Sequence, residues 1–304
     1  MRQQLTWAPY LFVSPFLLLF AVFGIYPIAK SLYLAFHTTN GPRSEVFTGL
    51  MNFKFLFEDP DFHTALKNTA IYAFFSVFLQ LPLSLGLALL LNQRWLKGRE
   101  FFRLVFISPH LVGQVFVGLM FQIMFVPRFG LLPRFLHYLF NASADTKWLG
   151  DPQLVMPALV FVSLWMYVGF NCVYFLAALQ NVDRELYEAA DVDGASGWAK
   201  FWHITLPAIK PVAVVVAVMS TIGSFQLYEL PYMLLGQGPG PNKSGLTIVM
   251  YLYQNGFETG NLGYASAIGW TLALIVLCVS LVQARLSGAF SSAALTGPAK
   301  KEKA

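Results

Sequence analysis

The sequence has few charged residues, and this excludes most soluble folds. Only 12% of its 304 residues are Asp, Glu, Lys or Arg, whereas 57% are apolar. Soluble domains usually have about 25% charged and about 45–50% apolar residues. Intrinsic disorder and a collagen-like chain are excluded by the same composition. The two cysteines, Cys172 and Cys278, lie inside apolar runs and behave as small apolar residues, so a disulfide scaffold is excluded as well.

Histidine is also scarce, and its positions disfavour an enzyme. The five histidines are scattered over loops and one end of an apolar run: His37, His63, His110, His137 and His203. None forms a His-x-x-x-His pair or joins two carboxylates at the spacing of metal ligands. We therefore expect no metal site and no catalytic residues, and we disfavour an intramembrane protease or transferase.

Six long apolar stretches are present, and each has about the 20 residues that a helix needs to cross a bilayer. They are Leu11 to Ala35, Ala70 to Leu91, Leu104 to Phe125, Leu154 to Leu179, Val212 to Leu235, and Gly263 to Val282. Gly223 and Pro231 would permit kinks in the fifth. The predicted fold is an all-α integral membrane protein with one six-span domain, residues 1–286. The segment 287–304 is rich in small residues and Lys, and is predicted to be a disordered tail.

The basic residues predict the orientation of the spans. With the N-terminus in the cytoplasm, 12 of the 20 Lys and Arg residues fall on the cytoplasmic side and eight on the other. The loop from Asn92 to Arg103 decides the assignment because four of its twelve residues are basic. Both termini are predicted to be cytoplasmic. This spread of basic residues over loops also disfavours nucleic-acid binding. The two long exported loops, His37 to Thr69 and Pro127 to Gln153, have room for short interfacial helices.

One cytoplasmic loop, residues 183–211, differs from the others because it reads as two short helices joined by a turn. Asp183 is placed to cap the first helix, and Asp193-Gly194 is placed to end it with Gly in the left-handed conformation. Ser196 can start the second helix, and Pro207 is expected to end it. Ala189 and Ala190 give the first helix a low profile that suits a groove in another protein. From periodicity alone, an amphipathic connector on the membrane surface fits equally well.

The loop also carries a motif. Glu188-Ala189-Ala190, then Gly194 and Ile204-x-Leu206-Pro207, resembles the EAA loop of ABC importer permeases at the family spacing. The stretch from Arg103 through Phe106 to Pro109, and Phe225 to Pro239 at the end of span five, resemble the carbohydrate-importer branch. Two departures from that branch are Gln237 in place of a Gly and Glu229 in place of an Asp.

The resemblance implies a type I permease subunit, similar to maltose permeases, in the bacterial plasma (inner) membrane. Its implied partners are a second homologous permease, an ATPase dimer, an extracytoplasmic solute-binding protein and membrane lipid. This chain is expected to bind no cofactor, and ATP and Mg would be used by the partner ATPase. The implied ATPase-coupling residues are Leu186, Tyr187, Glu188, Ala189, Ala190, Asp193, Gly194, Phe201, Ile204, Leu206 and Pro207.

Polar residues within the spans are candidates for the solute path. In span four, Ser163, Tyr167, Asn171 and Tyr174 recur at helical spacing on one face. The other candidates are Gln122, Ser224, Tyr228 and Glu229. Such residues also bond neighbouring helices in membranes, so helix packing is the competing interpretation for each one.

The scarcity of charge at bilayer depth favours a neutral, hydroxyl-rich solute. The same importer class with glycerol phosphate as its solute remains an alternative. An ion-coupled secondary carrier is disfavoured because we see neither inverted repeats nor a set of mid-membrane ionisable groups.

Overall fold

The computed structural model describes residues 7–39, 44–93, 95–141 and 143–287, which are mostly helical. Five of these helices are long and apolar enough to cross a membrane, and a bent pair of shorter helices provides a sixth crossing if it is one span. The expected all-α, multi-span fold is therefore confirmed. Residues 288–304 of the tail predicted at 287–304 lie outside the described residues, and so do the basic residues Arg2 and Arg94.

The chain divides into two compact units, and the first combines the residues up to His63 with Tyr251–Leu274. It contains one long apolar helix, built from α1, a π-helical turn and α2, and a two-stranded antiparallel sheet in which His37 pairs with Phe47. Its elements are α1 (Ala8–Phe20), the turn (Ala21–Ile25), α2 (Tyr26–Ala35), β1 (His37–Thr39), β2 (Glu45–Phe47), α3 (Met51–Glu58), a second π-helical turn (Gln254–Glu258) and the first half of α14 (Leu262–Leu286).

Two buried polar side chains hold the first unit together. The Asn52 amide donates to the carbonyl oxygens of Ala35 and His37, both at 2.9 Å, and so fixes α3 against the end of α2. The Asp59 carboxylate accepts hydrogen bonds from the hydroxyls of Tyr251 and Tyr264. The α3 helix shows that the segment from His37 to Thr69 contains a short helix. The β-hairpin was not predicted.

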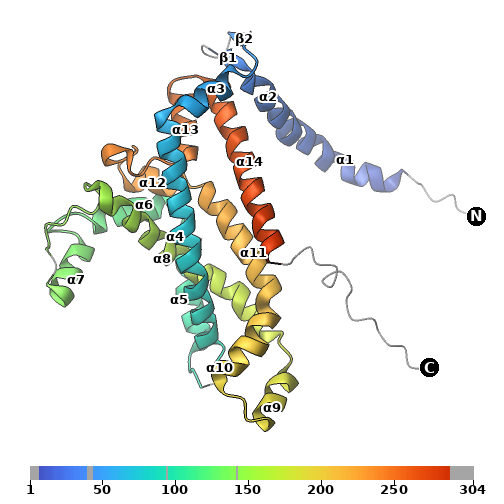
Figure 1. The fold of residues 1–304 in the computed structure, drawn as a ribbon, viewed down its shortest axis with the longest axis vertical. Coiled ribbons are helices and arrows are strands. Elements are labelled where there is room, and N and C mark those ends of the chain that lie inside the picture. Colours follow the sequence, from blue (N-terminus) through green and yellow to red (C-terminus); the bar gives the residue numbers. More distant parts are fainter. Residues whose placement is uncertain (1–6, 40–43, 94, 142, 288–304) are drawn as a thin grey trace, which may run out of the picture. The chain divides into compact units, whose positions relative to one another are not determined.

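The second unit comprises Thr64–Met250 together with the chain from Ile275 onward. It contains most of the candidate spans and the loop at residues 183–211 (Figure 1). Its helices are α4 (Pro60–Leu91), α5 (Arg99–Leu111), α6 (Gln114–Met124), α7 (Leu131–Phe140), α8 (Pro152–Gln180), α9 (Arg184–Val192), α10 (Gly197–Lys200), a π-helical turn (Phe201–Thr205), α11 (Leu206–Phe225), α12 (Glu229–Leu234), a short 3₁₀ turn (Pro241–Lys243), α13 (Ile248–Tyr253) and the end of α14.

Helix α8 is central to the packing of this unit. Its C-terminal half joins Ala88 and Leu91 of α4 and Ile209 and Val216 of α11 in one buried apolar cluster. Its N-terminal half joins α6, α12 and Tyr72 of α4 in a second cluster. Close backbone contact adds to this packing, since a Cβ at Gly169 would lie 1.8 Å from the Phe106 carbonyl oxygen. α5 and α8 therefore touch at backbone distance.

The third predicted span, Leu104 to Phe125, is wrong as a single straight helix. The chain leaves the helical conformation at Val112 and Gly113, and α5 and α6 meet at 96°. Val112 is extended with ψ 128°, so the i to i−4 hydrogen bonds that a continuous helix requires are interrupted there. The residues of α5 and α6 next to the break are equally apolar, so composition does not reveal it.

Two expectations about the fifth span are also corrected. Pro207 does not end the second loop helix, because one helix continues from Gly197 to Phe225. A proline cannot donate to the carbonyl four residues earlier. Here the π-helical turn at Phe201–Thr205 ends two residues before Pro207, which therefore lies in the first turn of α11. The span predicted to reach Leu235 breaks at Gln226–Tyr228 instead, between the two residues that were expected to permit kinks.

Candidate functional site

A cavity of about 370 Å³ lies between α4, α8 and α11 in the second unit. Four of the eight residues predicted for the solute path line it, namely Tyr167, Asn171, Tyr174 and Ser224. The first three face it together because they lie on one face of α8, as their spacing predicts. The lining that the structure describes contains aromatic rings, amides and hydroxyls and no Lys, Arg, Asp or Glu. Such a surface is suited to a neutral polar ligand.

The polar groups at the cavity are tied to neighbouring helices. The Gln114 amide on α6 donates to the Tyr167 hydroxyl at 2.7 Å, and the Asn171 amide donates to Ser220 Oγ on α11 at 3.1 Å. Close by, the His110 ring stacks on Phe170 with centroids 3.9 Å apart. His110 Nδ1 and Gln114 Oε1 are buried and have no partner within the described residues. Two buried polar atoms close to Tyr167 are therefore left without a hydrogen-bond partner in the described structure.

The other four predicted path residues lie outside this lining. Ser163 is fully buried in the helix interface, where its hydroxyl lies 3.4 Å from that of Ser76 on α4. Gln122 borders a separate cavity near Trp148. The Tyr228 ring stacks on Tyr232, and Glu229 is exposed at the start of α12. Four of the eight candidates therefore line this cavity, and the other four lie elsewhere in the described structure.

Residues of α4 that our sequence reasoning did not single out also line the cavity. Tyr72 and Gln80 face it, and both are almost fully buried. A signal for them was present, because Tyr72, Ser76, Gln80 and Ser84 recur at steps of four along an otherwise apolar span. These four residues show the same helical spacing that identified the polar face of α8.

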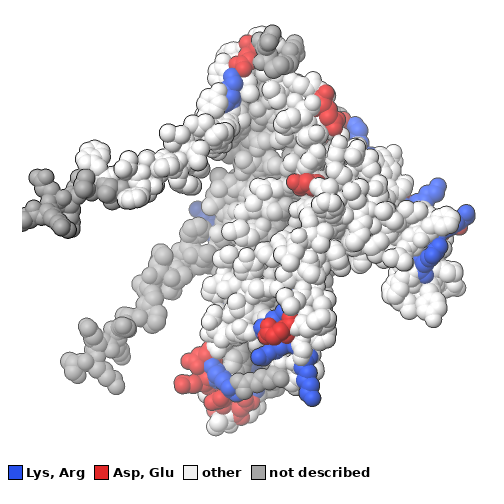
Figure 2. All heavy atoms as spheres, turned by 180° about the vertical axis from the view of Figure 1, so that it is seen from behind, with Lys and Arg blue, Asp and Glu red and all other residues white. Residues whose placement is uncertain are grey.

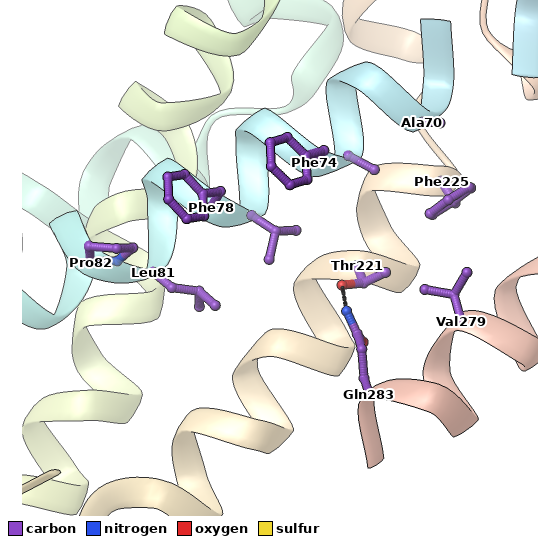
Figure 3. A pocket seen from close by; sticks show the side chains of 11 residues that line it. Ala70, Phe74, Phe78, Leu81, Pro82, Thr221, Phe225, Val279 and Gln283 are labelled. Atoms are coloured by element: carbon purple, nitrogen blue, oxygen red, sulfur yellow. Dashed lines mark hydrogen bonds between the residues drawn. The ribbon is translucent and has the colours of Figure 1, made fainter. Parts of the chain in front are cut away.

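A second hollow, of about 490 Å³, has a different chemistry (Figure 3). Phe74, Phe78 and Pro82 of α4 line one side, and residues of α11 and α14 line the other. Its polar groups belong to Gln283 and Thr221, which bond each other at 2.8 Å. Walls this apolar leave the hydroxyls of a sugar without partners, so the first cavity is the better candidate for a solute site.

The loop at residues 183–211 has the two-helix form that its sequence predicts. The Asp183 carboxylate accepts from the backbone N–H of Glu185, and Ser196 Oγ accepts from that of Ala199, so both predicted N-caps are present. Gly194 follows α9 with φ +70°, the left-handed conformation expected for it. The Ala195 N–H then closes back on the Ala190 carbonyl at 2.9 Å, as in a Schellman end.

Two side-chain contacts that were not predicted join the halves of this loop. The Tyr187 hydroxyl lies 2.8 Å from Thr205 Oγ1, and the Lys200 ammonium forms an ion pair with Asp191. The motif gives no signal for either contact, since the partners lie 18 and nine residues apart. These two contacts join α9 to the start of the long helix Gly197–Phe225.

Large apolar side chains remain exposed on the loop. Trp198 is 71% exposed and stacks on Phe201, and Leu186 is 52% exposed. Charged side chains gather at the end of the unit that carries α9 and α10 (Figure 2). Exposed apolar anchors rimmed by charge are typical of a protein-docking surface. Among the described residues, no group of His, Cys, Asp and Glu is placed to hold a metal ion.

These features can be compared with known proteins. Residues 99–292 match the family of binding-protein-dependent transport system inner membrane components. The arabinooligosaccharides transport system permease protein AraP of Bacillus subtilis is 40% identical, over 93% of this chain and 89% of its own length. The lactose transport system permease protein LacF of Rhizobium radiobacter is 34% identical, over 90% and 92%. A crystal structure of a bacterial ABC transporter that imports alginate superimposes with a TM-score of 0.81 at 26% identity, over 94% of this chain and 96% of that chain.

A helical fold with five or six candidate membrane crossings, an EAA-type loop and this match together define a transporter permease. The chain belongs to the family of binding-protein-dependent transport system inner membrane components. The resemblance drawn from its motifs is therefore confirmed, and the chain is a multi-pass protein of the bacterial inner membrane.

Proposed function

We propose that this chain forms half of the translocation path of an ATP-driven importer for a neutral sugar or oligosaccharide. The names of its relatives support the solute class, since AraP and LacF belong to arabinooligosaccharide and lactose transport systems. The uncharged lining of the 370 Å³ cavity supports a neutral solute over glycerol phosphate, which would require cationic groups. Aromatic rings and amides on one helix face suit a sugar ring.

The other half of the path belongs to a second, homologous permease in this proposal. The most apolar stretch of the helix Tyr10–Ala35 has none of its residues buried within the chain, so lipid or another subunit must cover it. A solute-binding protein delivers the sugar on the exported side. The alginate transporter supports this partner, because it was crystallised in complex with a periplasmic protein that holds an alginate pentasaccharide.

The single observation that carries the coupling proposal is the loop at 183–207. It is capped at both helix starts, cross-linked by Tyr187–Thr205 and Lys200–Asp191, and still exposes Leu186 and Trp198. A rigid loop that binds a partner through exposed apolar side chains transmits the movement of that partner to the membrane spans. In this proposal the partner is an ATPase dimer that binds ATP and Mg, and the permease has no ATPase site of its own.

Gly194 provides the sharpest test of the coupling loop. Nothing lies within 4 Å of a Cβ built there, so Gly194→Ala is disfavoured only by its left-handed backbone, at about 1 kcal/mol. Gly194→Val adds a β-branched side chain and should be worse. Gly197→Ala is the matched control, because Gly197 also has open space and its φ is not positive.

The expected result is loss of coupling with retention of the membrane domain. Gly194→Val, Glu188→Lys and Ala190→Trp should leave the chain inserted and the second permease bound, since all three sites are outside the spans. Recovery of the ATPase subunits on co-purification should fall, or ATP hydrolysis should continue without sugar uptake. Full uptake and full ATPase recovery in all three variants, with Gly197→Ala unchanged, would make the loop a passive connector.

A further inference from the structure

Helix α7 has no role in the solute cavity or the cytoplasmic loop, yet its position is tightly fixed. It begins at Leu131, just after α6 ends at Met124. A Cβ at Gly130 would lie 2.3 Å from the Met124 carbonyl oxygen, and the Arg128 N–H donates to the Ala144 carbonyl at 2.8 Å. Because α6 and α8 belong to spans, the loop between them leaves and re-enters the bilayer at one surface. With only ten residues α7 is too short to cross.

The helix presents three different faces. Leu132 packs against the apolar cluster of α6, α8 and α12, and Pro133 is buried. Arg134 and His137, three residues apart, share a polar stripe. Leu131, Phe135, Tyr138 and Leu139 follow one another at steps of four, three and one, which places them on a third face. They are 51–87% exposed, so this apolar face is uncovered within the unit.

The charges beside α7 border the apolar face without covering it. The Arg128 guanidinium forms an ion pair with Asp145 through two hydrogen bonds. Hydrogen bonding to Arg128 lowers the pKa of the Asp145 carboxyl. Arg134 Nε donates to the Arg128 carbonyl at 3.0 Å. Blue spheres gather around this helix in Figure 2. Guanidinium groups beside exposed aromatic and leucine side chains are complementary to lipid phosphates above acyl chains.

We propose that α7 is an interfacial anchor whose apolar face lies in the bilayer leaflet at which α6 ends. Leu131, Phe135 and Leu139 then contact acyl chains, Tyr138 lies at the headgroup level as aromatic residues do in membrane interfaces, and Arg134 faces the phosphates. In the predicted topology this is the outer leaflet. The anchor fixes the depth of the α6–α8 end of the chain, and it does not depend on which solute is transported.

The test places a fluorescent probe on each face of α7 in the full-length chain. Phe135→Cys and Leu139→Cys report on the apolar face, and His137→Cys is the control on the polar face. Cys172→Ala and Cys278→Ala remove the native thiols. Each variant is labelled with the environment-sensitive fluorophore NBD and reconstituted with its co-purified subunits in nanodiscs of phosphatidylcholine and phosphatidylglycerol, with and without lipids that carry a quenching nitroxide on the acyl chain.

We expect blue-shifted emission at positions 135 and 139 and quenching there at least threefold stronger than at 137. Equal, weak quenching at all three positions would overturn the anchor. So would lipid-independent fluorescence at 135 and 139 that changes only on adding the solute-binding protein, because the face would then bind that protein. Using both apolar positions guards against one variant that fails to fold. Uptake measured on the same samples tests the transport proposal separately.

Discussion

Two segments of the first unit that are far apart in the sequence are joined at the buried Asp59 carboxylate. It is 8% exposed and accepts from Tyr251, from Tyr264 at 2.6 Å and from the Asp61 backbone N–H at 2.9 Å. Burial raises the pKa of this carboxyl, but the hydrogen bonds outweigh burial, and the pKa lies below its ordinary value. Burial and the bond to Asp59 also raise the pKa of Tyr251 to about 12, so its hydroxyl remains a donor at neutral pH.

Tyr264→Phe should destabilise the protein in a pH-dependent way. A hydrogen bond to a charged group contributes about 1.5–3 kcal/mol, and the variant loses one such bond. Because the pKa of Asp59 is lower in the folded state, this carboxylate contributes to the free energy of unfolding above its unfolded pKa of about 3.9. That contribution is lost as the pH falls through the folded-state pKa. The gap in thermal midpoint between wild type and variant should therefore be widest above about pH 4 and narrow below it. Thermal unfolding of the purified protein in detergent measures this gap.

Tyr33→Phe is the matched control for this experiment. Among the described residues, none forms a hydrogen bond with the Tyr33 hydroxyl. Removing this hydroxyl should therefore change the thermal midpoint little at any pH. A gap for Tyr264→Phe that stays constant from pH 7 to pH 3.5 would show that Asp59 does not depend on this donor.

Tyr167 and Asn171 are the residues whose replacement should weaken sugar uptake. Asn171→Ala removes an amide at the cavity, and Tyr167→Phe removes a hydroxyl while keeping the ring. Each should cost about 0.5–1.5 kcal/mol of solute binding, or roughly a 2- to 10-fold higher half-saturation concentration. Uptake and basal ATP hydrolysis are measured on the same vesicles, and only uptake should change.

Cys172→Ala serves as the control on α8, since Cys172 neighbours Asn171 but packs in the buried cluster with α4 and α11. It should leave the half-saturation concentration unchanged. Normal uptake by Asn171→Ala, Tyr167→Phe and the double variant would assign these groups to helix packing.

At the level of elements, the sequence is most informative where local chemistry decides the structure. The caps at Asp183 and Ser196 and the left-handed Gly194 follow from residue types that prefer those backbone positions in any context. The shared face of Tyr167, Asn171 and Tyr174 follows from helical period alone. Which of these polar residues reach a cavity depends on packing: Ser163 has the same period and is buried against α4.

Breaks within apolar segments are the elements that composition does not predict. Val112 and Gly113 separate α5 from α6, yet the residues on both sides are equally apolar. Hydropathy measures transfer into lipid, and it is the same for a straight and a broken helix. Pro207 shows the reverse case, in which a strong local signal for a helix end is overridden because a π-helical turn precedes it.

At the scale of the whole molecule, the break at Val112 decides how many times the chain crosses the membrane. A broken span gives six crossings and termini on one side, whereas a re-entrant pair gives five and termini on opposite sides. Contacts with α8 favour a broken span. They move in one direction along it, from Phe106 at Gly169, through Gln114 at Tyr167, to Phe121 beside Trp165 and Phe161. A re-entrant pair would turn back toward its entry point.

The last prediction tests this topology with single cysteines in the full chain, from which both native cysteines are removed. Arg99→Cys and Lys147→Cys flank the α5–α6 pair and its following loop. Because α5 and α6 together traverse the bilayer, a membrane-impermeant maleimide should label position 147 on intact cells and position 99 only after permeabilisation. Glu45→Cys should behave like 147, and Lys300→Cys like 99, as the basic residues predict. Labelling of 99 and 147 from the same side would establish a re-entrant pair and place the two termini on opposite faces.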